Sequence, residues 1–113
     1  MTPEELAQGQ LEAYNARDID RFLQFYARDV VVYGVPSGEQ MRGREMMRER
    51  YRNLFENCPE LDCKLLNRMV MGDWVVDHEE VTGHAADPDG VVNAVAIYRC
   101  RDGLIGEVHF LDS

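Results

Sequence analysis

The chain of 113 residues has the usual length of one domain, carries 21 acidic against 12 basic residues, and is 45% hydrophobic. Its formal net charge of −9 repels phosphate backbones and anionic membrane surfaces, so we expect neither nucleic acid nor a membrane as a partner. The sequence has no apolar run long enough to span a bilayer and no secretion-type N-terminus. We therefore expect a single soluble domain over residues 1–113, located in the cytoplasm.

Helical patterns occupy the first half of the chain. Residues 2–5 are typical of a helix start, with Thr2 as the cap, and predict a helix to about Asn15. Asp18 is expected to cap a second helix, and a third is expected to begin after Gly43 and to end before Pro59. The expected faces toward the core are Leu6, Gln10, Ala13 and Tyr14; Ile19, Phe22, Leu23 and Tyr26; and Met47, Tyr51, Leu54 and Phe55.

A group of arginines accompanies the third helix. Glu45 and Glu49 are interleaved with them at helical spacing and can pair with them, so we interpret this segment as a solvated helix face. The basic residues are Arg42, Arg44, Arg48, Arg50 and Arg52.

Strand-like patterns follow, after a first short strand expected at 30–33. Turn residues at 72–73, 87–90 and 102–103 separate the later segments, and helices followed by hairpin-linked strands indicate an α+β fold. The later expected strands are Leu61 to Met71, Trp74 to Thr82, Val91 to Arg101 and Leu104 to Leu111.

Four short segments, 14–20, 25–30, 43–51 and 102–105, resemble the helix, strand and hairpin signatures of the NTF2-like superfamily, and within it the SnoaL-like and ketosteroid-isomerase-like group. The resemblance implies a curved antiparallel sheet in the shape of a cone, with three helices from the N-terminal half of the chain around a cavity. It also implies a homodimer formed through the outer face of the sheet, where Val95, Ile97 and Leu111 are expected.

Side chains alternate between the two faces of a strand, and the resemblance selects the face that lines the cavity. The residues that we expect to bind a ligand are Gln10, Tyr14, Tyr26, Tyr51, Trp74, Tyr98 and Phe110. Each aromatic residue taken alone fits a packed core equally well. Together their polar tips on apolar walls suit a small, mostly apolar molecule that carries an oxygen or two.

Ketosteroid isomerases use a carboxylate base and an oxyanion hole made from a tyrosine and a protonated aspartic acid. Aligned without gaps, Gly34 takes the position of the base, Gln10 that of the tyrosine and Ala96 that of the aspartic acid. The resemblance therefore argues against isomerisation by that mechanism.

His78 and Glu80 are expected on the cavity face of one strand and are our candidates for a catalytic acid–base pair. The alternative is that they hydrogen-bond to each other as a satisfied polar patch. Only these two of the neighbouring acidic and histidine residues share a face, so we expect no metal site. No phosphate loop or dinucleotide fingerprint is present, and we expect no cofactor.

These observations predict binding of a small apolar molecule, with cofactor-free acid–base chemistry of an isomerase, cyclase, lyase or hydrolase type if the protein is an enzyme. The alternative is a non-catalytic ligand-binding or protein-association module, in which the outer sheet face makes the functional contact.

Overall fold

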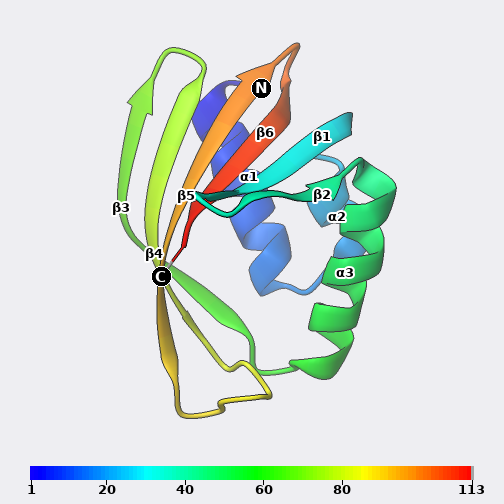
Figure 1. The fold of residues 1–113 in the computed structure, drawn as a ribbon, viewed down its shortest axis with the longest axis vertical. Helices are drawn as coiled ribbons and strands as arrows, with labels where there is room; N and C mark the ends of the chain where they lie inside the picture. Colours follow the sequence, from blue (N-terminus) through cyan, green and yellow to red (C-terminus); the bar gives the residue numbers. More distant parts are fainter. Residues whose placement is uncertain (113) are drawn as a thin grey trace.

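The computed structural model describes residues 1–112, which form three helices and a six-stranded curved sheet (Figure 1). This arrangement confirms the α+β class. In chain order the elements are α1 (Pro3–Asn15), α2 (Ile19–Leu23), β1 (Tyr26–Val35), β2 (Gly38–Arg42), α3 (Arg44–Asn57), β3 (Asp62–Met71), β4 (Trp74–Thr82), β5 (Val91–Arg101) and β6 (Leu104–Leu111).

The helices begin where the capping residues predict. The Thr2 hydroxyl accepts the backbone N–H of Glu5 at 3.2 Å, and the Glu5 carboxylate accepts that of Thr2 at 2.8 Å. Asp18 likewise accepts the backbone N–H of Arg21. The second helix is shorter than expected, because Tyr26 belongs to β1 and pairs with β6. Among residues 1–112 no helix is long and apolar enough to cross a membrane.

The strand order in the sheet is β2-β1-β6-β5-β4-β3. Neighbouring strands are antiparallel as expected, with the exception of β1 and β6, which run parallel. The edge strand β2 was not anticipated from the sequence. Its short pairing with β1 continues the sheet toward α3.

The helices cover the concave face of the sheet and build the core there. Helix α1 packs on β3 to β6, and α3 packs on β1 and β2. Fully buried side chains such as Phe22, Val30 and Ile105 lie between the two layers. Within the part of the chain that the structure describes, no helix packs on the outer face of the sheet (Figure 1).

Candidate functional site

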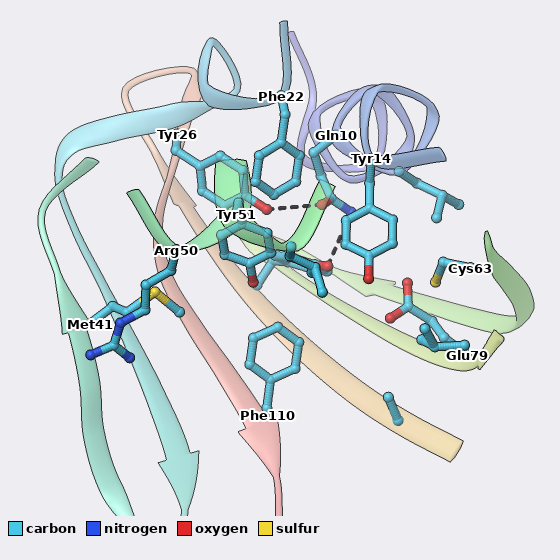
Figure 2. A pocket seen from close by; sticks show the side chains of 15 residues that line it. Gln10, Tyr14, Phe22, Tyr26, Met41, Arg50, Tyr51, Cys63, Glu79 and Phe110 are labelled. Carbon is cyan, nitrogen blue, oxygen red and sulfur yellow. Dashed lines mark hydrogen bonds between the residues drawn. The ribbon is translucent and has the colours of Figure 1, made fainter. Parts of the chain in front are cut away.

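A cavity of about 390 Å³ lies between the helices and the concave face of the sheet (Figure 2). This volume is in the range of small-molecule sites. The lining residues are Gln10, Leu11, Tyr14, Phe22, Tyr26, Met41, Arg50, Tyr51, Leu54, Cys63, Glu79, Val81, Ala94, Tyr98 and Phe110.

The exposure of the lining side chains distinguishes a closed end of the cavity from an open mouth. Gln10, Phe22, Tyr26 and Tyr98 are at most 4% exposed and form its closed end. Arg50 is exposed and marks its mouth. The walls between them are made by half-buried side chains, namely Tyr14, Tyr51, Leu54, Val81, Ala94 and Phe110. A ligand would therefore enter past α3 and extend toward α1.

Gln10 organises the closed end through three hydrogen bonds. Its side-chain oxygen accepts the Tyr26 hydroxyl at 2.9 Å, and its Nε2 donates to the Ala7 carbonyl at 3.0 Å and to the Tyr98 hydroxyl oxygen at 3.1 Å. The reverse amide orientation would place two oxygens in contact at Ala7, so the orientation is determined by its partners. Because Tyr98 accepts from Gln10, its own O–H remains available as a donor to a ligand.

Buried hydroxyls at this site stay protonated. Removal from water raises the pKa of Tyr26 and Tyr98 well above the ordinary value, and raises the pKa of Tyr51 to about 12. Burial also raises the pKa of Tyr14. The tyrosines can thus serve as hydrogen-bond donors but not as bases near neutral pH.

Glu79 is the acidic side chain that lines the cavity, and it is 5% exposed. Burial raises its pKa to about 7, with a smaller contribution from the charge of Asp77, whereas a contact with the Cys63 thiol and the charge of Arg68 act in the opposite direction. Figure 2 shows the Tyr14 hydroxyl pointing toward the Glu79 carboxyl group. A carboxyl group that is half ionised near pH 7 can accept or donate a proton.

A buried ion pair lies beside Glu79 on the same face of β4. Arg68 of β3 binds both carboxylate oxygens of the fully buried Asp77, through Nε at 2.7 Å and Nη2 at 3.0 Å. A third nitrogen of Arg68 donates to Gln8 of α1 at 3.0 Å. The pair therefore ties β3, β4 and α1 together.

The structure corrects the predicted face of β4. Val75, Asp77, Glu79 and Val81 point inward, whereas the expected cavity residues Trp74, His78 and Glu80 lie on the outer face. The sequence from 74 to 82 is polar on both faces, so its alternation does not select one.

His78 is exposed and does not line the cavity. The indole ring of Trp74 instead lies under the Arg99 guanidinium, at 5.4 Å, and near the ring of His109. The placement expected for the pair His78 and Glu80 inside the cavity is therefore wrong.

The other expected ligand-binding residues do line the cavity: Gln10, Tyr14, Tyr26, Tyr51, Tyr98 and Phe110. Sequence reasoning missed Glu79 and Arg50, which carry its charges. The sequence contains no signal for Glu79, because both faces of the strand from 74 to 82 carry polar residues.

Comparison with solved structures places this architecture among known folds. An uncharacterized cystatin-fold protein from Novosphingobium aromaticivorans is 24% identical, with a TM-score of 0.91 and 99% of both chains covered. A proposed polyketide cyclase from Sinorhizobium meliloti is 19% identical, with a TM-score of 0.79 over 94% of this chain and 93% of that one. A proposed hydroxylase from Streptomyces galilaeus is 20% identical, with a TM-score of 0.80 over 96% and 76%. At these identities the likeness establishes the fold.

No functionally curated protein matches the chain by sequence. The family profile of the SnoaL-like domain matches residues 7–108, which include the closed end of the cavity, Glu79 and the first part of β6. The chain therefore belongs to the SnoaL-like domain family.

Proposed function

We propose that the cavity binds a small, mostly apolar molecule with a carbonyl or hydroxyl oxygen, and that Glu79 exchanges a proton with it. The observation that carries this proposal is that one apolar cavity contains both a buried carboxyl group, Glu79, and an available hydroxyl donor, Tyr98. The family and the similarity to a proposed polyketide cyclase support a small-molecule ligand.

The proposed step needs no cofactor. The Glu79 carboxylate accepts a proton from the carbon next to a ligand carbonyl, and the electron pair of the broken C–H bond forms the C=C bond of an enolate. The negative charge that develops on the ligand oxygen is stabilised by the O–H of Tyr98. Return of the proton from Glu79 to the same or another carbon completes an exchange or an isomerisation.

The test of this function is exchange of carbon-bound hydrogen for deuterium. A panel of small cyclic and aryl ketones is incubated with the protein in D2O, and loss of the α-proton signals is followed by NMR. Exchange above the buffer rate is expected for at least one ketone that fits the cavity. Absence of exchange across a panel whose members bind would reject acid–base chemistry and leave the non-catalytic binding function.

Replacing Tyr98 by phenylalanine is expected to slow this exchange by about 100- to 1,000-fold, the usual effect of removing one donor to a developing oxyanion. The measurement is the NMR exchange rate with a saturating ketone. Tyr33→Phe is the matched control, because the ring of Tyr33 stacks on His109 on the outer face of the sheet. Equal rates in wild type and Tyr98→Phe would remove Tyr98 from the mechanism.

We also propose that the outer sheet face forms a homodimer. A row of directly paired residues crosses five strands on this face: Met69, Val76, Ile97, His109 and Tyr33. Met69 is 61% exposed. The other four are partly exposed, and a contiguous row of mostly apolar side chains at a surface is typical of an interface.

Sedimentation equilibrium is expected to give a dimer for wild type and a monomer for Ile97→Glu, because the substitution places a charge at the centre of the row. Asn93→Glu is the matched control, since Asn93 is on the same strand and face but lies outside the row. A wild type that sediments as a monomer at high concentration would refute the interface.

A further inference from the structure

Arg50 is the basic side chain among the residues that line the cavity. It lies on the same side of α3 as Met47 and Leu54, which are three residues before it and four after it. Figure 2 shows it on the side of the cavity formed by Met41, away from Glu79. Arg50 is exposed although it lines the cavity, as is usual for a long cationic side chain at the edge of an apolar surface.

Three of the neighbouring arginines are occupied by contacts within the protein. Arg48 pairs with Asp20 at 2.7 Å, Arg42 pairs with Glu39, and Arg44 donates to the Tyr26 carbonyl. Arg50 has no ion pair or hydrogen bond to another side chain within residues 1–112.

The pairing expected with Glu45 and Glu49 is also missing from the part of the chain that the structure describes. Helix α3 has four arginines and three glutamates, and among these charged residues Arg50 is the one that lines the cavity.

We infer that the ligand of this cavity is an apolar monocarboxylic acid with a second oxygen function, which places its carboxylate on Arg50 at the mouth and its carbonyl or hydroxyl group at Tyr98. This inference rests on the proposed binding function and names the substrate class. A planar guanidinium group binds a carboxylate through two parallel hydrogen bonds. The apolar walls between the two ends accept the hydrocarbon body of the acid.

The charges in the cavity favour this orientation over the reverse one. The Glu79 carboxyl group lies among buried side chains, where a second carboxylate would be repelled and would lose its hydration. At the mouth, a ligand carboxylate keeps part of its water and meets a cation. A keto acid or hydroxy acid is therefore expected to enter with its neutral oxygen first.

The test compares two probes of the same shape, benzoylpropionate and benzoylpropionamide, by calorimetric titration at low salt. Wild type is expected to bind the acid about fivefold tighter than the amide, since one exposed ion pair contributes on this scale. In Arg50→Gln the two affinities are expected to become equal. In the matched control Arg52→Gln the preference should persist, because Arg52 is exposed on the same helix and does not line the cavity.

The preference should also shrink when salt is added, because an exposed charge pair is screened. Equal binding of acid and amide by wild type would overturn the inference, as would an unchanged preference in Arg50→Gln. In either case ketone exchange that depends on Tyr98 would leave the proposed function standing. Absence of that exchange in wild type would instead reject the acid–base function, while the acid-to-amide ratio would still decide the role of Arg50.

Discussion

Replacing Glu79 by glutamine is expected to reduce the rate of ketone proton exchange by about 100- to 10,000-fold, the usual contribution of a positioned general base. The variant keeps the size of the side chain and removes its ability to accept a proton. In wild type the rate should rise with pH through about 7 and then level off, because burial holds the Glu79 pKa there and the ionised form is the active one. Glu80→Gln is the matched control on the outer face, and it should keep both the rate and the pH profile.

The same variant is expected to be more stable than wild type above pH 7. The folded-state pKa of Glu79 is raised from 4.5 to about 7, so between these values the folded protein holds a proton that the unfolded chain releases. Stability therefore falls as the pH rises through this window. Glu79→Gln removes this cost, which is on the order of 3 kcal/mol.

Urea unfolding at pH 5 and pH 8 measures the difference between the two proteins. That difference should be small at the lower pH and large at the higher one. A variant that loses both activity and stability at pH 8 would contradict this account, because it would indicate that Glu79 stabilises the fold in its ionised form.

Asp77→Asn is expected to cost about 3 kcal/mol of unfolding free energy, because it leaves the Arg68 guanidinium group, whose side chain is only 11% exposed, without its carboxylate partner. Urea unfolding at neutral pH measures this loss. Glu107→Gln provides the control, since its pair with Arg99 is exposed and should contribute less than about 1 kcal/mol. A similar small loss for Asp77→Asn would refute the structural importance of the buried pair.

Further variants distinguish the cost of an unpaired charge from the loss of the ion pair itself. Replacing both residues by apolar ones, Arg68→Met with Asp77→Leu, should recover most of the lost stability, because neither variant side chain carries an unpaired charge. The single variants should move the Glu79 pKa in opposite directions. It falls in Asp77→Asn, where a nearby negative charge is removed, and rises in Arg68→Met, where a positive charge is removed.

Local features of the fold were predictable because their signals are local. The cap at Thr2 and the turns at 72–73 and 102–103 depend on residues within a few positions of each other, and the strands begin and end at these turns as predicted. The parallel pairing of β1 with β6 has no such signal. It joins residues 31–35 to residues 107–111, and no pattern in either segment indicates which strand it pairs with.

The cavity face of β5 was predicted correctly, whereas that of its neighbour β4 was not. Tyr98 lines the cavity as expected, and Ala94 lies on the same face of the strand. The connection from β4 to β5 spans residues 83–90, which is too long to determine the register between the strands. The β3 strand also gave no guidance, because its pairing with β4 shifts at Leu66 and exchanges its two faces there. A register uncertainty of one residue in β4 was therefore enough to place Glu79 on the wrong face in the prediction.

The central position of β6 has a consequence for how the chain reaches this structure. The strand lies between β1 and β5, so without it the sheet separates into β2-β1 and β5-β4-β3. The contacts of β6 with β1 join segments that are far apart in sequence. Such contacts are entropically costly to form and slow the folding of a domain. The two halves of the concave surface can meet only after β6 has been synthesised and inserted, so we expect a nascent chain to have no binding cavity until its last strand is available.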